Sequence, residues 1–176
     1  TVTGVQTCAL PIFLVGGGDP LLAREPNAAP TGATYDPHRA DVRTLAKRTA
    51  RSLKASGVTS VELGFDDSLF TGPQVHPTWK PDYIPEEINP VSALWVDEGR
   101  ALPGQGPVAD PALEATTAFA QALARRGIAV MGNPTRTSAP AGATEVGRVT
   151  SPTVAQIVQR LVEVSDNAAA EVLLHF

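Results

Sequence analysis

The stretch that decides the fold is DPHRADVRTLAKRTARSLKASGVTSVELGF, residues 36–65. Asp36 and Pro37 are a suitable cap and first helical residue, and Gly57 is a suitable stop, so the pattern predicts a helix over 37–56. A β-type run at 58–65 follows at once. Apolar side chains in the predicted helix follow the spacing i, i+3, i+4, i+7, i+8 and i+11, and these are Val42, Leu45, Ala46, Thr49, Ala50 and Leu53.

Predicted strands and helices continue to alternate on both sides of this stretch. A short apolar run at 13–15 precedes it, and a second predicted helix at 111–126, opened by Asp110 and Pro111, leads into a run at 128–131. Strand, helix and strand in succession are typical of a parallel sheet, so the chain is predicted to be α/β. Residues 91–96 are predicted to form a fourth strand.

Irregular segments and two further helices complete the prediction. Loops are predicted at 66–90, 102–107 and 133–143. The pair Ser151 and Pro152 predicts the start of a third amphipathic helix, and residues 168–174 predict a fourth.

Composition excludes several classes of protein. The chain has 14 basic and 18 acidic residues, a net charge of −4, and no basic patch, which argues against a nucleic-acid-binding protein. Cys8 is the one cysteine, so an internal disulfide framework and a cysteine-rich zinc site are excluded.

The N-terminal residues resemble a translated sequencing adapter. Residues 2–12 read VTGVQTCALPI, which looks like the translation of a common short-read sequencing adapter, so residues 1–12 are expected to be an artefact. The apolar run at 8–15 is short, is interrupted by Pro11 and follows no Lys or Arg. It is therefore predicted to be neither a secretory signal nor a membrane span.

Two candidate ligand sites have an ordinary structural interpretation. The turn at 16–19, Gly-Gly-Gly-Asp, lacks the spacing of a dinucleotide or phosphate loop. The three histidines are scattered, so no metal and no cofactor are expected; they are His38, His76 and His175.

The paired acidic residues and the tryptophans also have structural interpretations. The acidic pairs at 66–67, 86–87 and 97–98 are expected to be solvated loop residues. Trp79 and Trp95 are expected to pack in the core.

The tripeptide Ser165, Asp166 and Asn167 is the strongest candidate. It lies between two predicted helices, where such residues are common as caps. Ser-Asp-Asn is also one of three motifs of penicillin-binding proteins and class A β-lactamases. The other two, S-x-x-K and K-T-G, are absent from these 176 residues.

Further segments strengthen this interpretation because they occur in one order. They are LVGGGDP (14–20), LGFDDSLF (63–70), PVSAL (90–94), FAQAL (119–123) and residues 151–174. Together they resemble the D-alanyl-D-alanine carboxypeptidase/endopeptidase family, the class C low-molecular-mass penicillin-binding proteins. The resemblance implies an inserted α/β domain at 13–138 and a helical piece of a β-lactamase/transpeptidase-like domain at 139–176, cut at both ends.

The resemblance also implies the chemistry. The substrate would be a peptidoglycan D-Ala-D-Ala stem peptide, with β-lactams as further ligands, and the enzyme would be extracytoplasmic. Ser165 would belong to the proton network of the reaction and Asn167 would hold the substrate's acyl chain, while Asp166 would face away as a structural anchor. Since the nucleophile motif is not in these residues, the isolated chain is expected to be inactive.

Two alternatives stay open at this point. One is a non-catalytic cell-wall peptide-binding or scaffold module. The other is a small-molecule enzyme that uses the turn at 16–19.

Overall fold

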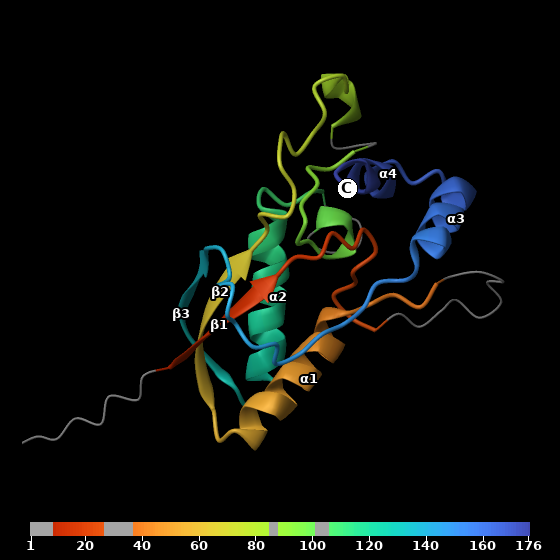
Figure 1. The fold of residues 1–176 in the computed structure, drawn as a ribbon. Helices are drawn as coiled ribbons and strands as arrows, with labels where there is room; N and C mark the ends of the chain where they lie inside the picture. The colour runs from red at the N-terminus through yellow and green to blue at the C-terminus, as the bar shows by residue number, and fades with distance from the viewer. Residues whose placement is uncertain (1–8, 27–36, 85–87, 101–105) are drawn as a thin grey trace, which may run out of the picture.

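The fold is mixed α/β, as predicted, in a computed structural model that describes residues 9–26, 37–84, 88–100 and 106–176. A parallel three-stranded sheet has the order β1-β2-β3, and helices α1 and α2 lie against one of its faces (Figure 1). The elements are β1 (Leu10–Val15), α1 (Val42–Ala55), β2 (Ser60–Asp66), η1 (Pro81–Tyr83), η2 (Asp97–Gly99), α2 (Pro111–Ala124), β3 (Ala129–Arg136), α3 (Val154–Val164) and α4 (Asn167–Leu174).

The main core lies between the sheet and the two long helices. From the sheet, the alternate residues Val61, Leu63 and Phe65 join this core. The helical period in the sequence also identifies the buried face of α1. That face contains five residues of the predicted stripe, which are Val42, Ala46, Thr49, Ala50 and Leu53.

Strand β1 is longer than predicted and includes part of the expected artefact. Leu10, Pro11 and Ile12 pair in parallel with residues 61–63 of β2. The side chains of Ile12 and Leu14 join the core because they are two residues apart on one face of the strand. Residues 10–12, which are part of the expected artefact, therefore belong to the sheet.

Helix α1 begins at Val42, later than the predicted start at Pro37. Its N-cap is Asp41, whose side chain accepts a hydrogen bond from the Thr44 N–H at 2.6 Å. The preceding backbone is held by Ala23, whose N–H donates to the Ala40 carbonyl and whose carbonyl accepts from the Val42 N–H, each at 2.9 Å. This bridge keeps the chain extended up to Asp41, and the predicted cap Asp36 lies outside the described residues.

The predicted strand at 91–96 is not a strand. Its backbone groups bond to separate loops: the Val91 N–H donates to the Gln74 carbonyl, and the Ala93 carbonyl accepts from the Gly18 N–H, both at 2.9 Å. Its consecutive side chains are buried, so an apolar run that is typical of a central strand belongs here to a buried irregular segment.

Two other boundaries also differ from the prediction. Strand β3 extends to Arg136, into the predicted loop at 133–143. Helix α3 is capped by Thr153 rather than Ser151, because Thr153 and Gln156 form a capping box. The predicted loop at 102–107 lies largely outside the described residues.

A second, smaller apolar cluster joins the C-terminal helix to the irregular segment. Its buried members are Ile88, Val91, Trp95, and Ala168 and Val172 of α4. At its border, Trp79 Nε1 donates to Glu171 Oε1 at 2.7 Å. Helix α4 thus packs against residues of the segments at 70–79 and 88–95 rather than against the main core.

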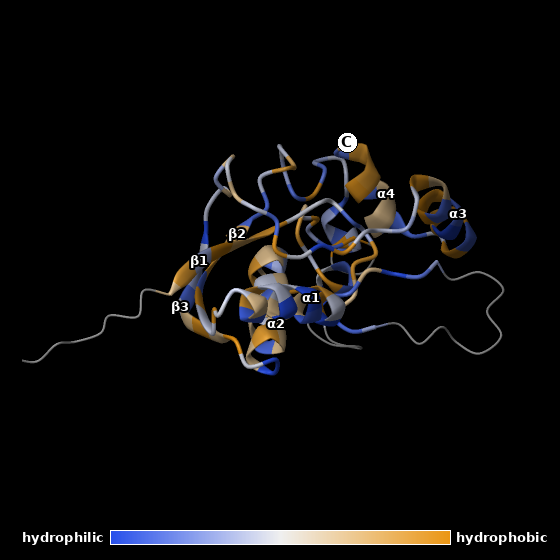
Figure 2. Ribbon diagram, turned by 60° about the horizontal axis from the view of Figure 1, so that its bottom comes forward, coloured by the Kyte–Doolittle hydropathy of each residue, from blue (hydrophilic) through white to orange (hydrophobic). Residues whose placement is uncertain are grey.

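Helix α3 leaves an apolar stripe uncovered. Val154, Val158 and Val162 follow one another at i+4 spacing and are 65%, 42% and 72% exposed. Figure 2 shows the mixture of hydrophobic and hydrophilic residues on α3, which lies away from the sheet. None of the described helices is both long and apolar enough to cross a membrane.

Candidate active site

The turn formed by Ser165, Asp166 and Asn167 connects α3 to α4, as the sequence predicts. Ser165 ends α3 in the left-handed conformation (φ 57°, ψ 49°), and the Asp166 N–H donates to the Leu161 carbonyl at 3.0 Å. Asp166 caps α4 by accepting from the Ala169 N–H at 2.8 Å. Asn167 is the first residue of α4. The turn is therefore short and held by hydrogen bonds to both helices.

All three residues of the turn line one open, polar pocket of about 220 Å³. Asp166, which is expected to face away as a structural anchor, caps α4 and also lines this pocket. Other parts of the wall come from distant segments of the chain and include Asn89, Glu98, Arg100 and Arg160. The pocket therefore joins the α3–α4 turn to the irregular segment around residues 88–100.

Asn89 is a deeply buried polar residue of this pocket, with 2% of its surface exposed. Its Nδ2 donates to the backbone carbonyl of Glu98 at 2.9 Å, which fixes the orientation of the side-chain amide. Its Oδ1 is buried and has no hydrogen-bond partner among the described residues.

Strained backbone conformations are concentrated around this pocket. Among the described residues other than glycine, three have a positive φ: Asp97 at 50°, Glu98 at 57° and Ser165 at 57°. Glu98 and Ser165 line the pocket, and Asp97 is the neighbour of Glu98. Such conformations are costly for residues with a Cβ atom, and they cluster at functional sites.

Glu98 is held in an environment that disfavours its negative charge. Burial raises the pKa of its carboxyl group, and the nearby charge of Asp166 raises it further, while Arg100, Arg160 and Arg39 act in the opposite direction. Two carboxyl groups and several guanidinium groups therefore share this part of the molecule.

Replacing Glu98 with glutamine is expected to raise the free energy of unfolding at pH 7. A raised pKa means that the folded chain holds the Glu98 proton more tightly than the unfolded chain, so ionisation above the ordinary value of 4.5 costs stability. The gain from Glu98→Gln should therefore shrink as the pH falls toward 4.5. Denaturant titrations across this range measure the difference, and Glu163→Gln, at an exposed position of α3, is the matched control. An equal gain at all pH values would contradict the assignment.

Several residues of this pocket are not predicted from the sequence. The pair Asp97 and Glu98 is expected to be solvated, but Asp97 Oδ2 lies 3.4 Å from Arg24 Nε, and Glu98 lines the pocket. Asn89 is likewise missing from the predicted site. Both segments resemble ordinary loops, and no signal in the sequence places them beside Ser165.

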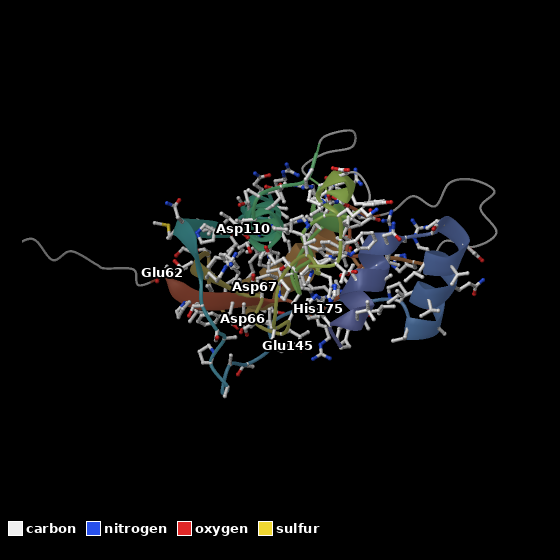
Figure 3. All side chains as sticks on the ribbon, turned by 90° about the horizontal axis from the view of Figure 1, so that it is seen from above. Glu62, Asp66, Asp67, Asp110, Glu145 and His175 are labelled. Atoms are coloured by element: carbon white, nitrogen blue, oxygen red, sulfur yellow. The ribbon has the colours of Figure 1, made fainter. Side chains whose placement is uncertain are left out.

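The other acidic and aromatic candidates have structural partners. Asp66, labelled in Figure 3, accepts from Ser68 Oγ at 2.6 Å and from the Ala139 N–H at 2.8 Å, and these bonds lower the pKa of its carboxyl group. Trp95 is buried in the second apolar cluster, as predicted, and Trp79 packs at its border. The pair at 86–87 lies outside the described residues.

Two of the histidines contact other side chains. His76 Nδ1 lies 2.7 Å from Thr78 Oγ1, and His175 stacks on Phe70 with ring centroids 4.9 Å apart. Within the described parts of the chain, no group of three or more His, Cys, Asp or Glu side chains is placed to hold a metal ion.

Two glycines of the turn at 16–19 lie close against the protein's own groups, whereas a Cβ atom on Gly17 would meet nothing within 4 Å. A Cβ atom on Gly16 would lie 2.5 Å from the Ala93 carbonyl oxygen, and one on Gly18 would clash with the Phe176 ring. Gly18 also has a φ of 71°, so both positions need glycine for packing or for conformation. These contacts favour the structural interpretation of the turn over a ligand-binding one.

Comparison with known proteins finds two similar curated relatives. Carboxypeptidase Rv3627c of Mycobacterium tuberculosis is 36% identical over 175 residues, which cover 97% of this chain and 35% of the relative. Carboxypeptidase DacB of Mycolicibacterium smegmatis is 30% identical over 165 residues, which cover 91% of this chain and 34% of the relative. The chain thus spans about a third of the length of these relatives.

A family signature matches nearly the whole chain in two stretches, residues 3–107 and 102–176. The match includes the turn at Ser165 and Asn167 together with the segment that supplies Asn89 and Glu98. It confirms the family that the ordered motifs predict. The chain belongs to the D-Ala-D-Ala carboxypeptidase 3 (S13) family.

Proposed function

We propose that this chain is part of a serine-type D-Ala-D-Ala carboxypeptidase that acts on peptidoglycan stem peptides. The observation that carries the proposal is the fixed turn that brings Ser165 and Asn167 to one polar pocket in a chain of this family. In the reaction, a serine oxygen attacks the penultimate carbonyl, the bond to the terminal D-Ala breaks, and water then hydrolyses the acyl-enzyme.

Ser165 and Asn167 have separate roles in this proposal. The Ser165 hydroxyl passes a proton toward the leaving amine, and the Asn167 amide donates to a carbonyl of the bound peptide. Their positions i and i+2 in a capped turn hold both groups in place before the substrate binds, which lowers the entropic cost of reaching the reactive geometry. Asp166 stabilises the turn through its bond to the Ala169 N–H.

The proposal also concerns the rest of the enzyme. The nucleophile, its lysine and the K-T-G motif would come from chain outside these residues. Residues 13–138 would form the inserted α/β domain and 139–176 part of the transpeptidase-like domain, in an extracytoplasmic protein that binds β-lactams. The adapter origin of residues 1–12 also stays a prediction.

The test compares the full-length gene product with residues 1–176 alone. A fluorescent penicillin is expected to label the full-length protein covalently and to leave the isolated chain unlabelled, because these 176 residues contain no S-x-x-K serine. Gel fluorescence and intact-protein mass spectrometry measure the adduct. Labelling of Ser165 in the isolated chain, or no labelling and no release of D-Ala by the full-length protein, would overturn the proposal.

A further inference from the structure

We propose that Asn89 is a further substrate-contacting residue of this site, and that its side-chain oxygen accepts a hydrogen bond from a backbone N–H of the bound peptide. This assignment rests on the proposed function and adds a contact that the Ser-Asp-Asn motif does not include. Asn89 belongs to the irregular segment before η2 and reaches the pocket only through the fold.

The first argument is the unused acceptor. Asn89 is 2% exposed, and its Nδ2 already donates to the Glu98 carbonyl at 2.9 Å. Its Oδ1 is buried without a partner among the described residues, although buried amide oxygens are nearly always hydrogen-bonded in folded proteins. This acceptor belongs to a residue that lines the pocket, and it is left for a donor that the ligand brings once the side chain opens to the pocket.

The second argument is the chemistry of the pocket. Asn89 and Asn167 line the same pocket of about 220 Å³. A peptide backbone has both carbonyl groups and N–H groups, so Asn167 as a donor and Asn89 as an acceptor are complementary to it. The rest of the lining also mixes acceptors and donors, with two carboxyl groups and two guanidinium groups, those of Glu98, Asp166, Arg100 and Arg160.

The third argument is the way that Asn89 is held. Its Nδ2 bond supports the backbone at Glu98, one of the strained left-handed residues beside the pocket. Strain that is retained next to a fixed, unused acceptor indicates that this wall is shaped for binding. Because Asn89 also supports this backbone, a loss of activity on mutating it would not by itself separate a structural role from a contact with substrate.

Combining variants of Asn89 with analogues of the substrate separates a structural role from a contact with substrate. The full-length protein is assayed with the tripeptide diacetyl-L-Lys-D-Ala-D-Ala and with analogues in which one non-scissile amide N–H is replaced by an ester oxygen. For the wild type, one of these replacements is expected to lower kcat/KM about tenfold, because it removes the donor to Asn89 Oδ1. In Asn89→Ala the same replacement should change kcat/KM less than about twofold, since the acceptor is gone.

Two further variants keep the test decisive. Asn89→Leu also lacks the acceptor but keeps the size of the side chain, so it replaces Asn89→Ala if the cavity left by alanine prevents folding. Asn89→Asp keeps an acceptor oxygen and should retain the penalty for the ester analogue, even if its own kcat/KM is lower.

The outcomes distinguish this assignment from the function on which it rests. Equal penalties in the wild type and in the variants that lack the acceptor, or no penalty for any analogue in the wild type, would overturn the Asn89 assignment alone. Absence of any turnover of the parent tripeptide by the wild type would overturn the proposed function, and this assignment with it.

Discussion

Replacing Trp95 with alanine is expected to lower the free energy of unfolding of the chain by about 3–5 kcal/mol. The Trp95 side chain is 1% exposed and belongs to the second apolar cluster, together with Ile88 and Val172. Its Nε1 also donates to the Asp19 carbonyl at 3.1 Å, so the substitution leaves both a cavity and an unpaired acceptor. Denaturant unfolding followed by circular dichroism measures the loss.

Two control variants separate the causes of this loss. Trp95→Phe keeps most of the ring volume but removes the Nε1 donor, so it should be less destabilising than Trp95→Ala. Val162→Ala, on the exposed stripe of α3, should change the free energy of unfolding by less than about 0.5 kcal/mol. A Trp95→Ala variant as stable as Val162→Ala would show that the second cluster contributes little to folding.

Replacing Asn167 with alanine in the full-length protein is expected to lower kcat/KM for a D-Ala-D-Ala peptide by about 10²–10³-fold, the range seen when one positioned donor is removed from an active site. The fold should be little affected, because the cap of α4 is Asp166 and not Asn167. Release of D-Ala and the rate of acylation by penicillin both measure the effect.

The matched control for this variant lies on the same pair of helices. Gln159→Ala changes an exposed amide of α3 that donates to Glu163 at 3.0 Å and does not line the pocket. It should leave kcat/KM within about twofold of the wild type, since substitutions at such surface positions change little. A loss of less than about threefold in Asn167→Ala, far below the effect expected for a positioned donor, would remove Asn167 from the proposed mechanism.

Local patterns in the sequence predict the parts of the fold that depend on local contacts. The apolar stripe of α1 and the stop at Gly57 are set by spacing and by backbone conformation, and both hold in the structure. The start of α1 does not follow the same pattern, because Ala23 pairs with the backbone on either side of Asp41 and delays the helix. The pair Asp36 and Pro37, on which the predicted start depends, carries no information about this contact with Ala23.

The residues of the candidate site are likewise predicted only in part. Ser165 and Asn167 belong to a motif within three residues, and the structure places them on one pocket. Asn89 and Glu98 become visible only when the segment at 88–100 is folded, because both are predicted loop residues, on either side of the apolar run at 91–96. Local patterns carry no information about contacts between segments that are distant in the sequence, so the residues that complete the pocket are missed.

The hydrogen bond between Trp79 and Glu171 has a consequence for the order in which the chain folds during synthesis. Its two partners are 92 positions apart, and α4 shares its apolar cluster with residues 88–95. A ribosome releases the N-terminal partner first, and contacts between distant positions form only after the cost of closing the intervening loop has been met. The surface that supports the turn at Ser165 and Asn167 is therefore synthesised before the turn itself, which takes its final geometry when α4 docks.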